Sequence, residues 1–142
     1  MLKRLFRSDR GFTLIEVLIV VVIVAILAAI SVPIYIQYVE GARAADPQAT
    51  IGAIYNAAKM YRQDQGEYPT DVQVLETEEY LEIDLATYDQ WEFQIVGAVN
   101  NLEQIMATST ERMKGGAGKV VIYDIQTGKF TGYGLPSDLE GQ

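Results

Sequence analysis

The sequence contains neither cysteine nor histidine. Their absence excludes a disulfide framework, a thiol nucleophile, a Cys/His zinc site and a Ser-His-Asp triad. Any bound metal would have to be a hard cation held by oxygen ligands. Basic side chains are scarce as well, because 11 Lys and Arg stand against 19 Asp and Glu, a formal net charge of −8. Since phosphate contacts need Lys and Arg, we expect no direct nucleic-acid binding.

What is present is an uneven distribution of charge around a long apolar run. Residues 1–11 carry a net charge of +3 and the remaining 131 residues a net charge of −11. Residues 17–30 are 14 consecutive apolar positions, and the run extends to Ile36 with only Ser31 and Pro33 interrupting it. As a helix, residues 17–36 would span roughly 30 Å, the thickness of a bilayer core. The basic flank would stay in the cytoplasm and the acidic body outside it.

Two simple interpretations of this amino-terminal segment are a cleaved secretory signal peptide and an uncleaved signal anchor. The small residues at Ala29-Ile30-Ser31 fit a signal-peptidase site. Neither interpretation explains Glu16. A carboxylate in an apolar helix costs at least ~2 kcal/mol when it lies within the bilayer core, and it usually needs a partner there. A position of Glu16 at the level of the lipid headgroups would escape most of that cost.

A third interpretation uses the whole segment RGFTLIE, residues 10–16. This segment resembles the prepilin motif of type IV pilins and pseudopilins, in which a short basic leader and a Gly precede Phe-Thr-Leu-Ile-Glu and an apolar helix. Pro33 within the helix matches as well, and the resemblance covers residues 1 to about 40. It implies cleavage after Gly11 by a membrane prepilin peptidase and N-methylation of the new amino-terminal residue, Phe12.

The chemistry of such a cut can be stated independently of the family. Cleavage after Gly11 leaves an ammonium on Phe12, four residues before Glu16, so both would share one helix face. In an apolar bundle, the Glu16 carboxylate of one subunit can pair with the Phe12 ammonium of a neighbour. Because an unpaired charge is expensive in that setting, the pair would favour one axial register. Phe12 and Glu16 are therefore the predicted assembly residues.

The expected fold class is α+β, with a long amino-terminal helix packed on a small antiparallel sheet as in type IV pilins. We expect a leader at residues 1–11, a transmembrane and filament-core helix at 12–36, an amphipathic helix at 37–66 and a globular head at 67–142. Pro33 should break or kink the helix, and the family loses helix near this position in the assembled filament. Gly41 is a second position at which the helix should be weakened. Asp46-Pro47 predicts the start of a new helical run that Gly66 ends.

In the head, period-two alternation from Trp91 predicts a strand. Further strands are expected at 102–109, 119–125 and 130–133, with a glycine-rich connection at 111–119 and a hairpin turn at Thr127-Gly128. Residues 71–81 should form a short helix or an irregular connection. The helical stripe that should pack on the sheet is made of Ile51, Ile54, Tyr55, Ala58 and Tyr61.

No metal, cofactor or catalytic site is expected. The acidic run Glu76, Glu78, Glu79 and Glu82 is a solvated face or, alternatively, attracts a basic neighbour or a weakly bound cation. Many type IV pilins close a carboxy-terminal loop with a disulfide, which this chain cannot form. Major pseudopilins often hold calcium in an acidic carboxy-terminal loop, but Asp138 and Glu140 are too few acids for it.

The resemblance implies a non-enzymatic filament subunit, most consistent with a major pseudopilin of type II protein secretion. The alternative is a type IV pilus major pilin for adhesion, twitching motility or DNA uptake, and a more remote one is a membrane-anchored domain of another function. The implied partners are further copies in a helical filament, prepilin peptidase/methyltransferase, an inner-membrane assembly platform and minor pilins or pseudopilins. The implied location is the bacterial inner membrane, crossed once with the head outside the cytoplasm, and then a pseudopilus or surface pilus.

Overall fold

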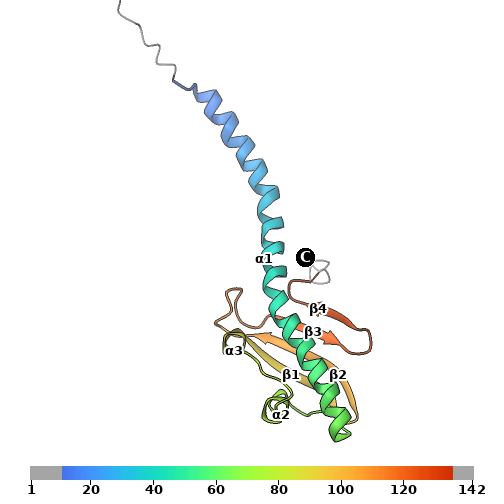
Figure 1. Ribbon diagram of the computed structural model, residues 1–142. Coiled ribbons are helices and arrows are strands. Elements are labelled where there is room, and N and C mark those ends of the chain that lie inside the picture. The colour runs from blue at the N-terminus through green and yellow to red at the C-terminus, as the bar shows by residue number, and fades with distance from the viewer. Residues whose placement is uncertain (1–10, 136–142) are drawn as a thin grey trace, which may run out of the picture. The chain divides into compact units, whose positions relative to one another are not determined.

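The computed structural model describes residues 11–135 (Figure 1). The elements in chain order are α1 (Leu14–Gln65), α2 (Val72–Thr77), α3 (Leu85–Gln90), β1 (Trp91–Ala98), β2 (Asn101–Ser109), β3 (Val120–Asp124) and β4 (Lys129–Gly132). The chain divides into two units between Ile36 and Gln37. The first contains the apolar part of α1, and the second contains the rest of α1 and the sheet, so the expected α+β fold is confirmed.

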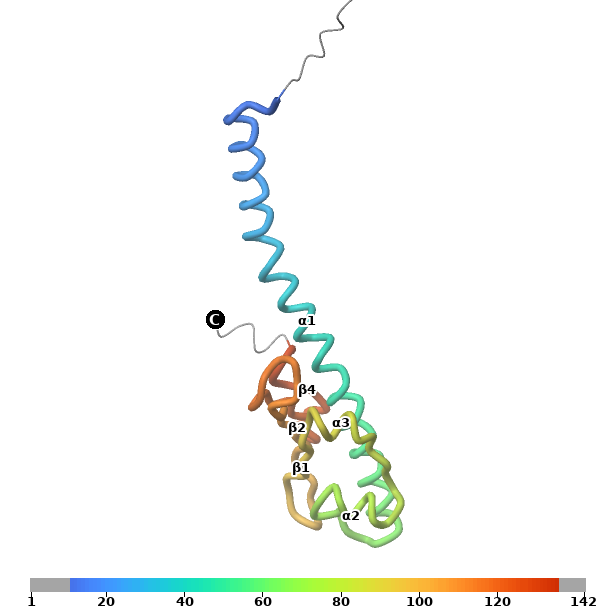
Figure 2. Tube along the Cα trace, turned by 90° about the vertical axis from the view of Figure 1, so that its left-hand side faces the viewer, coloured from blue at the N-terminus to red at the C-terminus, as the bar shows by residue number. Residues whose placement is uncertain are grey.

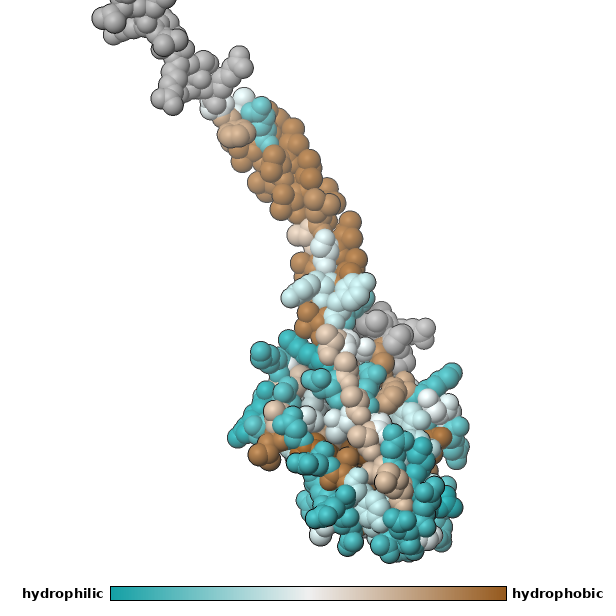
Figure 3. Space-filling model, in the orientation of Figure 1, coloured by the Kyte–Doolittle hydropathy of each residue, from teal (hydrophilic) through white to brown (hydrophobic). Residues whose placement is uncertain are grey.

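In the first unit, α1 is apolar on all sides, and its large aliphatic side chains are exposed from Leu14 to Ile36 (Figure 3). The helix is long and apolar enough to cross a membrane. β-branched residues lower helix propensity slightly, but lipid requires backbone hydrogen bonds to close within the segment. A helix apolar all round must be covered, either by lipid or by other helices.

One prediction about α1 is wrong, because no new helix begins at Asp46-Pro47. The helix continues from Leu14 to Gln65 through Pro33, Gly41 and Pro47. Pro47 lacks the N–H that would bond one turn back, which costs about 3 kcal/mol in a helix interior. Its side chain is fully buried in the head, and this packing offsets the lost bond. Loss of helix around Pro33 on assembly stays a prediction.

In the second unit, one face of α1 packs on the sheet and forms the core (Figures 1 and 2). Ile51, Ile54 and Ala58 are fully buried, whereas Tyr55 and Tyr61 are half-buried against the core. The predicted stripe therefore lies where the core is. From the sheet, the largest buried side chain is Trp91, whose ring centroid lies 6.3 Å from that of Tyr133.

The sheet is a four-stranded antiparallel meander in the order β1-β2-β3-β4. Trp91 pairs with Ser109, Ala107 with Val121 and Tyr123 with Phe130. Since side chains alternate across a strand, these inward residues line one face. The register between β1 and β2 shifts between Val96 and Gly97, where a bulge interrupts the pairing before it continues to Ala98. The four strands lie close to their predicted positions.

Two short helices connect α1 to the sheet. Asp71 caps α2 by accepting a hydrogen bond from Gln73 N–H, and Asp84 caps α3 by accepting one from Ala86 N–H, both at 2.9 Å. Carboxylates at this position satisfy backbone donors that a first helical turn leaves free. The sequence predicted the first helix only as one of two options for residues 71–81, and α3 was not predicted.

At Gly132 in β4, the backbone conformation and a close contact with β3 both favour glycine. It has φ of 100°, and a Cβ there would collide with the backbone oxygen of Val120. Gly66, which ends α1, has φ of 85° and open space around it. We expect Gly66→Ala to cost roughly 1 kcal/mol of unfolding free energy and Gly132→Ala distinctly more, because strain and collision add. Equal midpoints of denaturant unfolding for the two variants would contradict this account.

Candidate assembly site at the amino end of α1

The first turn of α1 is fixed by a reciprocal pair of hydrogen bonds between Thr13 and Glu16. Thr13 N–H donates to Glu16 Oε2 at 2.8 Å, and Glu16 N–H donates to Thr13 Oγ1 at 3.2 Å. This is a capping box, in which two otherwise unpaired backbone donors at the helix start are satisfied. Glu16 therefore has a local role that the sequence analysis missed, although the spacing Thr-x-x-Glu before an apolar run was a readable signal for it.

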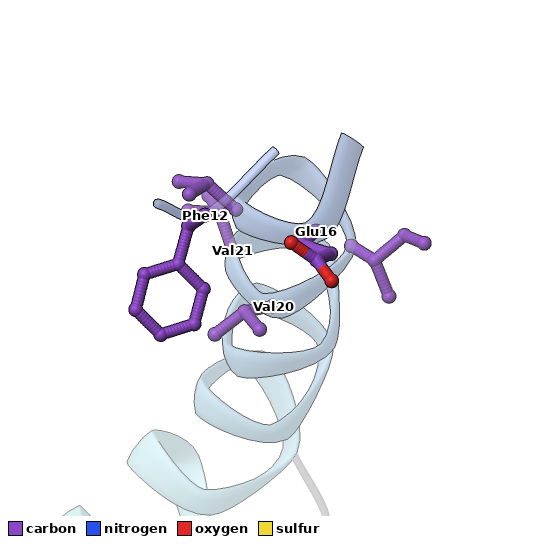
Figure 4. A pocket seen from close by; sticks show the side chains of 6 residues that line it. Phe12, Glu16, Val20 and Val21 are labelled. Atoms are coloured by element: carbon purple, nitrogen blue, oxygen red, sulfur yellow. The ribbon is translucent and has the colours of Figure 1, made fainter. Parts of the chain in front are cut away.

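In the uncut chain, Phe12 lies outside the helix that contains Glu16. The helix begins at Leu14, so in the uncut chain Phe12 precedes it and the rule for residues four apart does not apply. Phe12 and Glu16 nonetheless line one apolar groove together with Val17, Ile19, Val20 and Val21 (Figure 4). In Figure 4 the Phe12 ring lies beside Val20, and the Glu16 carboxylate lies near the start of the same helix.

The predicted cleavage point lies outside regular secondary structure. Gly11 and Phe12 are exposed and precede α1, and 88% of the Phe12 side chain is accessible. An exposed, non-helical backbone of this kind is the sort of segment that peptidases cut. The basic residues 3–10 of the expected leader lie outside the described residues.

The acidic run in the head does not form one uniform surface. Glu76 accepts hydrogen bonds from Tyr88 Oη at 2.8 Å and from Ile83 N–H at 3.4 Å, so it is part of the structure of the α2–α3 region. Glu78, Glu79 and Glu82 are exposed. Within residues 11–135, no group of three metal-ligating side chains is close enough to hold an ion. Asp138, Glu140 and the tail at residues 137–142 lie outside the described residues.

The Tyr88–Glu76 contact predicts destabilisation at alkaline pH. Burial raises the pKa of Tyr88, and the hydrogen bond to Glu76 raises it further. Because the folded pKa lies above the ordinary tyrosine value of ~10, this contribution to stability is complete below that pH and is lost as pH rises through the folded pKa. We expect Tyr88→Phe to flatten the loss of unfolding free energy above about pH 10, measured by denaturant titrations. Tyr38→Phe, at an exposed tyrosine, should retain the loss, and an unchanged slope in Tyr88→Phe would contradict the assignment.

Comparison with known proteins identifies the amino-terminal segment. Residues 6–32 match the model of the prokaryotic N-terminal methylation motif. The chain is 41% identical over 70 residues to type II secretion system core protein G of Escherichia coli, covering 49% of this chain and 48% of that protein. It is 43% identical over 70 residues to core protein G of Pseudomonas aeruginosa, covering 49% of each.

A further relative is the type IV major pilin protein PilA of Myxococcus xanthus, 38% identical over 60 residues, or 42% of this chain and 27% of PilA. The chain thus spans about half the length, or less, of the curated relatives it matches. The methylation motif, the partial likeness to these relatives and the long helix on an antiparallel sheet support a relationship to the type IV pilin and pseudopilin family. Type IV pilins and pseudopilins are structural subunits, and the long apolar helix and the motif fit a protein anchored in the inner membrane.

Proposed function

We propose that the chain is a structural subunit that is cut after Gly11 and polymerises into a type IV filament. The observation that carries the proposal is the exposed apolar surface of α1, which bears one carboxylate, Glu16, in the turn that follows Phe12. Lipid can cover this surface before assembly, and the same surface of neighbouring copies can cover it afterwards. The alanines at 25, 28 and 29 would allow the helices to approach closely.

Glu16 can serve both its own helix and a neighbour. Its Oε2 atom accepts the Thr13 N–H, and a carboxylate has about four lone-pair sites, so further acceptor capacity remains. In the filament that capacity would accept the Phe12 ammonium of an adjacent copy. The capping box would hold the carboxylate in place before the neighbour arrives, which lowers the entropy cost of forming the pair.

Within this class we propose a major pseudopilin of a type II secretion system. The two relatives named core protein G support this choice, as does a head without the disulfide found in many pilins. The second candidate is a type IV pilus major pilin, which the likeness to PilA supports.

Electron microscopy of cells expressing the chain at its natural level separates the two candidates. We expect no long surface fibres, with short filaments appearing only when the subunit is overproduced. Long fibres that an antibody against the head decorates at natural expression would overturn the pseudopilin assignment in favour of the pilus.

A further inference from the structure

Charge is strongly segregated along the head sequence. Residues 63–111 contain 12 acidic side chains and no basic one, whereas residues 112–119 contain three basic side chains and no acidic one. We call residues 112–119 the cationic loop. Its bases are Arg112, Lys114 and Lys119, and all three are exposed.

The cationic loop is held firmly although it contains three glycines. Ser109 donates its hydroxyl to Gly116 O at 2.7 Å and accepts the Lys119 N–H on the same oxygen at 2.8 Å. Met113 anchors the loop from within, since its side chain is 2% exposed. A loop tied down in this way holds the backbone of its lysines at fixed places, so a partner meets no cost of ordering the loop itself.

Within residues 11–135, two of the three bases lack a counter-ion. Arg112 pairs with Asp89, but neither Lys114 nor Lys119 has a carboxylate within ion-pair distance in the part of the chain that the structure describes. The ammonium of Lys119 lies 5.6 Å from the ring centroid of Tyr133, a contact that does not neutralise its charge. In a subunit of net charge −11, two exposed lysines on one loop can attract a negative partner.

A group of exposed carboxylates lies near the carboxy-terminal end of α1. Glu78, Glu79 and Glu82, which we call the acidic surface, are exposed around the turn after α2. This turn is fixed to α1, because Tyr80 Oη donates to Asp64 Oδ2 at 2.8 Å. The pKa of Tyr80 is raised because its phenol donates that bond to a carboxylate. Figures 1 and 2 both show α2 beside the carboxy-terminal end of α1.

The cationic loop lies at the other end of the head. Gly115 approaches the Tyr133 hydroxyl, and the next residue, Gly134, lies against Glu40 and Ala44 of α1. The acidic surface is tied to α1 at Asp64, about 20 residues further along the helix than Ala44. At ~1.5 Å per residue, the two charged surfaces are separated by roughly 30 Å along α1.

We propose that the cationic loop of one copy binds the acidic surface of the next copy along the filament. The proposal rests on the proposed filament function, in which subunits share one orientation and opposite ends of successive heads face each other. The same contact then repeats at every subunit and relieves the repulsion between acidic heads. Each exposed ion pair contributes little, so the contact selects the arrangement of the heads while apolar packing of α1 drives assembly.

Charge reversal tests the contact in whole cells, with the fraction of subunit recovered in sheared filaments as the readout. Lys114→Glu and Glu79→Lys should each lower that fraction about fivefold, the equivalent of ~1 kcal/mol, the upper range for an exposed pair. The double variant Lys114→Glu/Glu79→Lys should return to within about twofold of the parent, because the pair is restored in the opposite sense.

Lys129→Glu is the matched control, since it makes the same charge change on the exposed β3–β4 hairpin. We expect it to leave the yield unchanged. Equal losses from Lys114→Glu and Lys129→Glu, or losses that add in the double variant, would overturn the contact while filaments of the parent still form. Complete absence of filaments from the parent would instead overturn the proposed function and this contact with it.

Discussion

Glu16→Gln is expected to reduce filament assembly severely while membrane insertion is retained. In a bundle of apolar helices, removing the carboxylate leaves the Phe12 ammonium of a neighbour buried without a partner, which costs about 3–5 kcal/mol. Filament yield should therefore fall on the order of 100-fold or more, given that 1.4 kcal/mol is tenfold. The measurement compares the subunit in sheared filaments with the subunit in the membrane fraction.

Glutamine is the informative substitution because it separates charge from capping. The Gln side chain can still accept the Thr13 N–H, as in other capping boxes, so the start of α1 is preserved. Thr13→Ala makes the opposite change, removing a cap worth about 1 kcal/mol and keeping the charge. We expect Thr13→Ala to lower filament yield much less than Glu16→Gln. The reverse order would show that helix capping, and not charge pairing, is what assembly requires of Glu16.

Ile54→Ala should strongly destabilise the head. Ile54 is fully buried where α1 meets the sheet, and truncating a buried isoleucine leaves a cavity that costs about 2–5 kcal/mol. The single tryptophan, Trp91, is buried in the same core, so its fluorescence reports unfolding of the head without added probes. The full chain in detergent, titrated with denaturant, gives the change in unfolding free energy.

Leu85→Ala is the matched control, because Leu85 is 82% exposed. Its effect should stay within about 0.5 kcal/mol, as for most surface substitutions. A loss of stability in Leu85→Ala as large as in Ile54→Ala would place the core elsewhere than at the contact between α1 and the sheet.

The sequence predicted the features that depend on periodicity and on a long motif. The apolar run, the stripe around Ile54 and the strand from Trp91 each repeat a pattern over many residues, and the structure has them in place. Features that depend on one or two side chains were missed. The α3 helix has six residues and rests on a single cap at Asp84, and the Thr13–Glu16 capping box is a local arrangement of the same kind.

Other features depend on tertiary contacts that no local pattern encodes. Asp46-Pro47 has the composition of a helix start, yet burial of Pro47 keeps it within α1. The separation between the cationic loop and the acidic surface follows from how Tyr80 and Gly134 contact α1. Charge counts along the sequence could show that the bases cluster, but not at which end of the head they lie.

The central claim is that the chain is cut after Gly11 and methylated on Phe12. The most direct test is the mass of the amino-terminal peptide, measured on protein purified from the cells that naturally make it. Our account predicts that the chain begins at Phe12 and that this residue carries one methyl group on its amino nitrogen. A chain that still carries residues 1–11 would contradict the account and indicate an uncleaved anchor. A chain that begins at Val32 would contradict it as well, because cleavage after Ser31 is the mark of a secretory signal peptide.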